Sequence, residues 1–249
     1  MKEIVGKTKI KTNNLPKLTN TENGPEYDTC KIAEEFNNFF TNIGPKLANK
    51  IPNVRNSIED YLTRTEHEII DNELTFEEFE CAFKSTQKNK ATGIDNLNCN
   101  LMIDVYKEIK DPLFYIFSKC IEKSIFLDNL KVAKVTPIFK TGDLTKVGNY
   151  RPISVLPIFS KILERIIYNR IYSHLTKHNL LFSRQFGFQK NTSTEHAILQ
   201  LTDDITKGFS KGEVTLGVFI DLSKAFDTVN HDILLRKLKF MEFQIEHIT

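Results

Sequence analysis

Asp221 is the residue of this 249-residue chain whose position best suits a metal ion. It follows a mostly apolar run at positions 214–220, rich in β-branched and aromatic residues, which predicts a buried strand that ends at the carboxylate. After a break at 222–226, Asp227 or Thr228 is expected to cap a helix. A hard cation such as Mg²⁺ prefers oxygen ligands, so this carboxylate is a candidate metal ligand. Taken alone, Asp221 is also compatible with a helix cap or a salt bridge.

Two cations, Lys140 and Arg151, flank a predicted β-hairpin. Residues 132–140 have the composition of a strand, Thr-Gly-Asp at 141–143 is a turn signal, and 149–155 is the expected returning strand. The prolines of this second strand restrict it to an edge or to partly irregular structure. Two cations on a flexible hairpin can clamp a triphosphate. Exposed hairpin charges without a ligand would show the same pattern.

Positive charge is concentrated between Lys131 and Lys190. This segment holds eleven Lys and Arg against two acidic residues, a net charge of +9, whereas the whole chain has a net charge of only +2. Such asymmetry indicates a polyanion partner for the segment, and a solvated basic face is the alternative.

Apolar periodicity predicts several helices, and the 40% hydrophobic content supports a core for them. Each predicted helix has a local signal in the sequence. The signals are phenylalanines at helical spacing near 30–48, a capping box of Thr75 with Glu78, Asp111-Pro112, a long apolar stripe from Ile158, and a capping box of Thr192 with Glu195.

Other familiar kinds of site are not favoured by the sequence. His174 and His178 stand one helical turn apart but lack an H-E-x-x-H pattern and a third ligand, so we expect surface histidines. Asp203-Asp204 falls within a helical period and is expected on a solvated helix face. There is no Walker loop and no nucleophile elbow.

The cysteines and the apolar runs indicate the compartment. The cysteines form no C-x-x-C pair, and we expect them to be reduced and mostly buried. No apolar run approaches the roughly 18 residues of a membrane span, and the N-terminus lacks the apolar core of a signal peptide. The expectation is an intracellular protein that is neither secreted nor membrane-bound.

Five segments, in order, resemble motifs of the reverse transcriptases of non-LTR retrotransposons (LINE, jockey-like). The first precedes the fingers subdomain, three resemble fingers motifs 1 to 3, and the last resembles motif A of the palm subdomain. The segments are KNKATGIDNLNCNLM (88–102), KVTPIFKTGD (134–143), NYRPISVLPIFSKILERII (149–167), QFGFQKNTSTEHAI (185–198) and VFIDLSKAFDTVNHDIL (218–234). The helix near 30–48 also resembles the linker that precedes the polymerase region in these elements.

The resemblance implies a role for each matching residue. Asp221 and the main-chain carbonyl of Leu222 would bind Mg²⁺, with Mn²⁺ as an alternative, and Phe226 would exclude a 2′-hydroxyl. Lys140 and Arg151 would contact the triphosphate of a dNTP. Loop 88–97 would lie along the template. The other residues expected to bind template or nucleic acid are Lys161, Arg165, Arg170, Gln185, Gly187 and Lys190. The implied partners are an RNA template, a DNA primer or target, and a dNTP, in the nucleus or a cytoplasmic ribonucleoprotein.

Two departures from the family pattern accompany the resemblance. Position 189 is Gln where the third fingers motif usually has Arg, and Lys190 is the nearest replacement. The family's Y/F-A-D-D motif and thumb are not in this sequence, so we expect no primer extension by these 249 residues alone. The alternative function is a non-catalytic RNA- or DNA-binding remnant of a transposable element.

The expected fold is α+β. It comprises an N-terminal linker region (1–74), a helix-rich fingers subdomain with a small β element (75–212), and the first strand and helix of a truncated palm (213–249). In such a palm, strand 214–221 would lack neighbouring strands and expose an edge.

Overall fold

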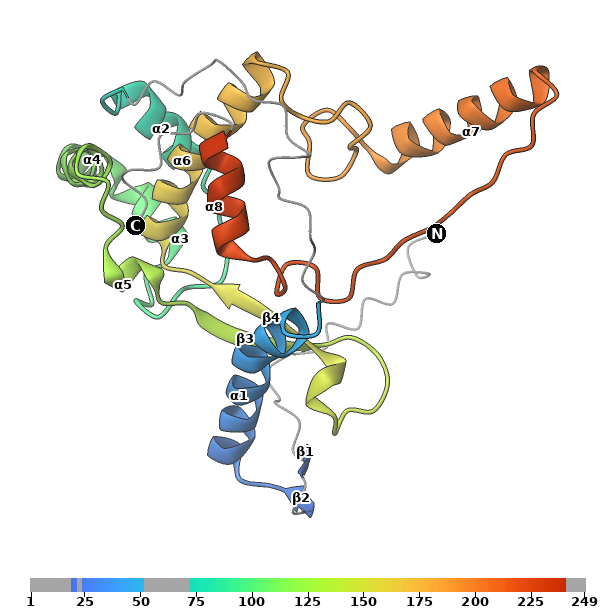
Figure 1. The fold of residues 1–249 in the computed structure, drawn as a ribbon. Coiled ribbons are helices and arrows are strands. Elements are labelled where there is room, and N and C mark those ends of the chain that lie inside the picture. Colours follow the sequence, from blue (N-terminus) through green and yellow to red (C-terminus); the bar gives the residue numbers. More distant parts are fainter. Residues whose placement is uncertain (1–18, 22–23, 52–71, 241–249) are drawn as a thin grey trace, which may run out of the picture. The chain divides into compact units, whose positions relative to one another are not determined.

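The computed structural model describes residues 19–21, 24–51 and 72–240, and these form a helix-rich α+β structure (Figure 1). Two short antiparallel strand pairs accompany the helices. In chain order the elements are β1 (Thr19–Thr21), β2 (Gly24–Glu26), α1 (Thr29–Ala48), α2 (Phe76–Lys84), α3 (Cys99–Asp104), α4 (Tyr106–Glu122), α5 (Asp128–Lys131), β3 (Lys134–Phe139), the 3₁₀ helix η2 (Val147–Asn149), β4 (Tyr150–Val155), α6 (Ile158–Lys177), α7 (Thr194–Ser210) and α8 (His231–Phe240). Within the described ranges, no helix is both long enough and apolar enough to cross a bilayer.

The chain divides into two compact units. The first unit comprises residues 1–166 and 226–249, and the second comprises 167–225. Helix α6 begins in the first unit and ends in the second. Lys140 and Arg151 therefore belong to the first unit, and Asp221 belongs to the second.

Phenylalanine supplies much of the core of the first unit. The ring of Phe79 on α2 is fully buried, and its centroid lies 5.9 Å from those of Phe114 and Phe117 on α4. The start of α6 is also buried, with Ile158, Ile162, Leu163 and Ile166 each 1% exposed. The apolar stripe predicted from Ile158 is confirmed, because it forms a 20-residue helix with a buried face.

Helix α2 begins with the capping box that the sequence predicts. The hydroxyl oxygen of Thr75 accepts a hydrogen bond from the Glu78 backbone N–H at 3.2 Å, and the Thr75 N–H donates to the Glu78 carboxylate at 3.0 Å. Both donors would otherwise lack a partner within the helix.

Replacing Thr75 by alanine is expected to lower the free energy of unfolding by about 1 kcal/mol, because one backbone N–H loses its acceptor. Urea denaturation followed by circular dichroism measures this change. Thr75→Ser keeps the hydroxyl and should stay close to the wild type. Equal stability of the alanine variant and the wild type would contradict the role of the cap.

Three helix starts differ from those expected. Helix α4 begins at Tyr106 and contains Pro112, whose missing N–H removes one hydrogen bond while the buried face of the helix continues. Ser193, and not Thr192, caps α7 by accepting from the His196 N–H at 3.4 Å. Helix α8 starts at His231, after the turn formed by residues 223–228, so neither Asp227 nor Thr228 caps it.

The histidine and cysteine expectations were partly wrong. His174 is only 8% exposed, because it follows Leu163 and Ile166 at helical spacing and so lies on the buried side of α6. Its ring centroid lies 4.7 Å from that of His178. All four cysteines are free thiols, of which Cys99 and Cys120 are buried; the remaining two, Cys30 and Cys81, are exposed.

Candidate functional site

The β3–β4 hairpin places Lys140 and Arg151 on one face. Arg151 pairs with Ile138, and the Lys140 N–H donates to the Asn149 carbonyl at 2.8 Å, which continues the ladder by two residues. Opposite residues of an antiparallel pair share a face, so the two cations are diagonal neighbours, about 7–8 Å apart at their Cα atoms. Both side chains are exposed. This spacing suits two cations that grip one polyphosphate.

The other face of the hairpin is covered by aromatic rings. Tyr150 lies opposite Phe139, with ring centroids 5.4 Å apart, and meets Phe36 of α1 edge-on at 4.9 Å. Tyr150 is 5% exposed, and this burial, together with the charge of Asp143, raises the pKa of its hydroxyl. The hydroxyl therefore stays protonated and donates to the Leu144 carbonyl at 2.8 Å. The predicted hairpin is confirmed, but the sequence did not indicate that α1 supports it (Figure 1).

The connection between the two strands is held by its own polar groups. The Asp143 carboxylate accepts from the Thr145 N–H at 2.9 Å and from its hydroxyl at 2.7 Å, and these bonds lower the pKa of Asp143. Asn149 donates from its side chain to the Asp143 carbonyl at 2.8 Å. Gly142 has a φ of +96°, and a Cβ there would lie 2.8 Å from the Asn149 amide nitrogen. The turn therefore requires glycine at this position.

The loop at 88–97 is fastened next to the start of α6. Gly93 approaches the chain at Leu156 and Pro157 so closely that a Cβ would lie 2.7–2.8 Å from backbone atoms. The Lys161 ammonium donates to the Ala91 carbonyl at 3.5 Å. Lys161, which we expected to bind nucleic acid, therefore also helps to hold the loop expected along the template.

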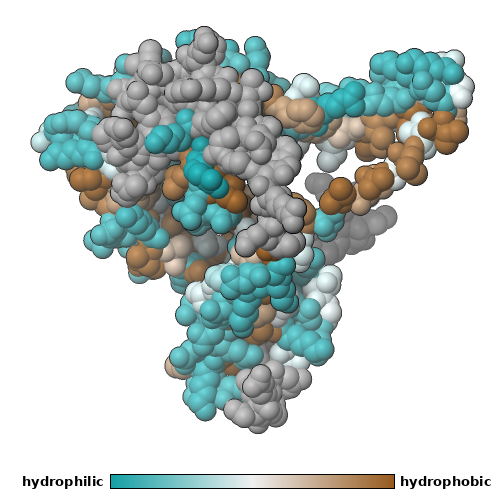
Figure 2. All heavy atoms as spheres, viewed as in Figure 1, coloured by the Kyte–Doolittle hydropathy of each residue, from teal (hydrophilic) through white to brown (hydrophobic). Residues whose placement is uncertain are grey.

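Asp221 does not end a strand in this structure. Residues 213–222 form no strand, and the apolar side chains of Val218, Phe219 and Ile220 are 75%, 89% and 83% exposed. Figure 2 shows hydrophobic surface along this segment. The predicted strand fails because an extended segment needs a partner for its backbone hydrogen bonds and for its apolar side chains.

The candidate metal ligands offer the right chemistry but are not assembled. Asp221 and Leu222 supply a carboxylate and a carbonyl oxygen, which are donors that Mg²⁺ accepts. In the described ranges, the structure gathers no group of three or more His, Cys, Asp or Glu side chains that could hold a metal ion. Phe226 is exposed and belongs to the first unit, whereas Asp221 belongs to the second.

The loop between α6 and α7 is closed by side-chain hydrogen bonds within the second unit. Gln185 donates to the Gly187 carbonyl at 3.1 Å, and Gln189 donates to the Phe182 carbonyl at 3.3 Å. Lys190 donates its backbone N–H to the Tyr172 hydroxyl at 3.0 Å and places its ammonium 4.8 Å from that ring. Gln189 thus stabilises the loop through its hydrogen bond to Phe182, and Lys190 contacts Tyr172 of α6.

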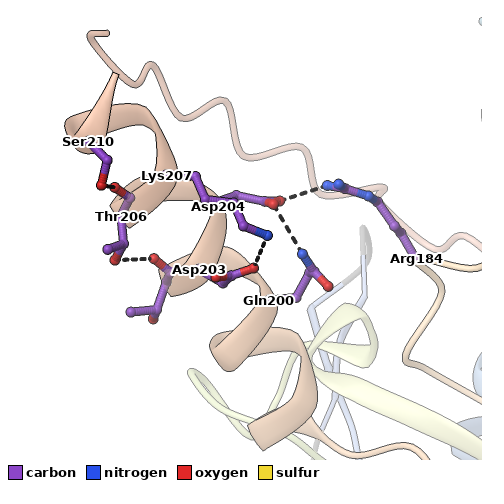
Figure 3. A network of polar contacts seen from close by, with 8 residues as sticks. Arg184, Gln200, Asp203, Asp204, Thr206, Lys207 and Ser210 are labelled. Carbon is purple, nitrogen blue, oxygen red and sulfur yellow. Dashed lines mark hydrogen bonds and ion pairs between the residues drawn. The ribbon is translucent and has the colours of Figure 1, made fainter. Parts of the chain in front are cut away.

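Asp203 and Asp204 form ion pairs on α7, as expected for a solvated helix face (Figure 3). Asp204 accepts from Arg184 at 2.7 Å and from Gln200 at 3.0 Å, and Asp203 pairs with Lys207. Partial burial acts to raise the pKa of Asp204, but the bonds from Arg184 and Gln200 outweigh it and hold this pKa below its ordinary value. Arg184, which the sequence did not single out, ties the loop after α6 to α7.

Comparison with known proteins assigns the chain to a family. Residues 138–248 match the family model "Reverse transcriptase (RNA-dependent DNA polymerase)". Over 166 residues the chain is 36% identical to "Probable RNA-directed DNA polymerase from transposon BS" of Drosophila melanogaster, covering 66% of this chain and 18% of that protein. Over 170 residues it is 31% identical to "RNA-directed DNA polymerase from mobile element jockey" of the same fly, covering 67% and 18%.

A more distant relative shows the same pattern. "Retrovirus-related Pol polyprotein from type-1 retrotransposable element R2" of Popillia japonica is 30% identical over 106 residues, covering 43% of this chain and 14% of that protein. The chain thus spans less than a fifth of the length of these relatives. The matched residues contain the hairpin cations, α6, the loop after it and Asp221. The chain therefore corresponds to part of a reverse transcriptase of the jockey-like non-LTR retrotransposon type.

Proposed function

We propose that this chain supplies the nucleotide- and template-binding fingers and the first metal-binding carboxylate of an RNA-directed DNA polymerase. The fingers would comprise residues 75–212, and the start of the palm would comprise 213–249. The observation that carries the proposal is the hairpin, because it presents Lys140 and Arg151 on one exposed face within the matched residues. The polymerase would act in the nucleus or in a cytoplasmic ribonucleoprotein.

The reaction would be nucleotidyl transfer. A primer 3′-hydroxyl would attack the α-phosphorus of a dNTP paired with the RNA template, and pyrophosphate would leave. Most of the catalysis in such reactions is positioning and neutralisation of phosphate charge. Lys140 and Arg151 would hold the triphosphate, and Asp221 with the Leu222 carbonyl would hold Mg²⁺, which supplies charge neutralisation at the phosphates. Phe226 would lie under the sugar and exclude a 2′-hydroxyl.

The hairpin part of the proposal is testable on the chain as it stands. Lys140→Gln combined with Arg151→Gln is expected to weaken binding of Mg²⁺–dTTP by at least about tenfold, because a hydrogen bond to a charged group contributes about 1.5–3 kcal/mol. Photocrosslinking of labelled dTTP to the purified protein, in the presence of an oligo(dT)–poly(rA) duplex, measures the affinity.

Lys131→Gln combined with Lys134→Gln is the matched control. It removes the same charge from the end of the hairpin opposite the turn, where Lys134 pairs with Val155, and from Lys131 at the end of α5 just before β3. This control should bind dTTP about as well as the wild type. Equal losses in both double variants would show that net charge, and not the clamp, determines binding.

A second candidate function is binding of nucleic acid without catalysis. The net charge of +9 between residues 131 and 190 favours it, because a polyanion would bind this segment whatever happens at Asp221. Salt-dependent RNA binding without specific labelling by dTTP would support this alternative over the polymerase.

A further inference from the structure

The contact between α1 and the β3–β4 hairpin extends the candidate site beyond the residues that match the family. Ile32 and Phe36 of α1 are 0% and 3% exposed, and they form one buried cluster with Tyr150 of β4. Phe40 and Val147 pack against the edge of this cluster. Helix α1 ends at residue 48, far before the first matched residue at 138. It is therefore joined to the hairpin by tertiary packing and not by proximity in the sequence.

Tyr150 is the residue that connects the packing of α1 on the hairpin to the two cations. It lies between Asn149, the partner of Lys140, and Arg151 in the chain, and its side chain points to the opposite face. Its hydroxyl also bonds to the Leu144 carbonyl in the turn. A displacement of the Tyr150 backbone would thus change the direction in which Arg151 and Lys140 leave the other face.

The hairpin alone cannot hold the side chains of Lys140 and Arg151 in a fixed direction. A two-stranded hairpin alone is marginally stable in water. Here Pro137 lies directly opposite Pro152 at a pair that exchanges no ladder hydrogen bonds, so neither strand has an outward N–H there with which a further strand could pair, and the hairpin stays two-stranded. On the covered face of the hairpin, the ring of Tyr150 packs against Phe36 of α1 and Phe139 of β3.

We propose that α1 is a positioning element of the triphosphate clamp, with Phe36 as its positioning residue acting through Tyr150. This inference rests on the proposed function of Lys140 and Arg151. Helix α1 then belongs functionally with the fingers and is not a passive linker. Phe36 would touch neither nucleotide nor metal, and its effect would be on how well the two cations are held.

Hydrogen–deuterium exchange and dTTP photocrosslinking test this inference on the whole chain. Phe36→Ala should raise the exchange rate of the amides at 138–151 by at least about tenfold and weaken dTTP binding by about tenfold. The reason is that the substitution leaves a cavity beneath Tyr150, so the hairpin opens more often. Amides of α2 and α4 should exchange as in the wild type. Phe36→Leu, which refills most of the cavity, should restore both properties in large part.

The controls separate positioning from general unfolding. Tyr27→Ala removes an aromatic side chain that is 70% exposed just before α1, and it should leave both measurements unchanged. If Phe36→Ala also loosens α2 and α4, amide exchange and dTTP binding are compared in Phe36→Leu and Tyr150→Phe instead. Tyr150→Phe removes only the hydroxyl bond to Leu144. Unchanged exchange at 138–151 in Phe36→Ala would overturn the inference. Failure of the wild type to bind dTTP would count against the proposed function alone, because the exchange measurement does not depend on a nucleotide.

Discussion

Phe79→Ala is expected to lower the free energy of unfolding by about 3–5 kcal/mol, the usual cost of removing a buried aromatic side chain. Phe79 is fully buried, and its ring centroid lies between 5.8 and 6.2 Å from those of four other phenylalanines. Such aromatic pairs contribute beyond the area they bury. Because Phe79 joins α2 to α4, its removal leaves a cavity at their junction.

Urea denaturation followed by far-UV circular dichroism measures the loss, because the chain has no tryptophan to report by fluorescence. Tyr115→Ala is the matched control: it also removes an aromatic ring from this helix pair, but Tyr115 is 64% exposed on α4. The control should cost less than about 1 kcal/mol. Similar losses in both variants would mean that the α2–α4 contact does not dominate the stability of the first unit.

Local signals in the sequence predicted most of the helices and the hairpin. The capping box at Thr75, the apolar stripe from Ile158 and the turn at Gly142 each specify structure through residues close in the chain. Such short-range patterns decide which backbone groups are satisfied locally. Helix starts were less predictable, because Thr192 and Ser193 are both good caps and tertiary packing decides between them.

The contacts between distant segments could not be predicted. Nothing in the spacing of Phe36 indicates that its partner is Tyr150, since many pairings of apolar residues bury similar area. His174 illustrates the same limit, because a polar residue beside an apolar stripe gives no sign of how wide the buried face is. The strand predicted before Asp221 failed for a related reason. Strand formation depends on partner strands, and composition alone does not supply them.

The parts of the candidate site that depend on residues close together in the sequence were predictable, and the other parts were not. Lys140 and Arg151 were expected to flank a hairpin, and the register places them on one face. The role of Gln189 was not predictable, because its hydrogen bond to Phe182 closes a loop whose shape the sequence does not reveal. Asp221 was singled out by the apolar run before it and by its motif, and its assembly with other ligands stays a prediction.

Reversing the charge of Lys161, Arg165 and Arg170 together should weaken binding of single-stranded RNA by at least about 50-fold at about 0.15 M salt. Each phosphate contact to a single strand contributes about 0.7 to the slope of log affinity against log salt, so three lost contacts flatten that slope by about two. Fluorescence anisotropy of a labelled RNA, measured over a series of salt concentrations with the 249-residue protein, gives both quantities.

The geometry of α6 also predicts how the loss of RNA affinity is divided among the three residues. Lys161 and Arg165 stand one turn apart, whereas Arg170 is five residues further along and faces a different side of the helix. An RNA backbone that follows one face of α6 should therefore lose more affinity from the double variant Lys161→Glu/Arg165→Glu than from a double variant that includes Arg170→Glu. Reversal of three exposed lysines elsewhere, Lys46, Lys107 and Lys123, changes the net charge equally and should leave the salt slope nearly intact. If that control matched the α6 variant, general electrostatic attraction would explain the binding, and α6 would have no special part in it.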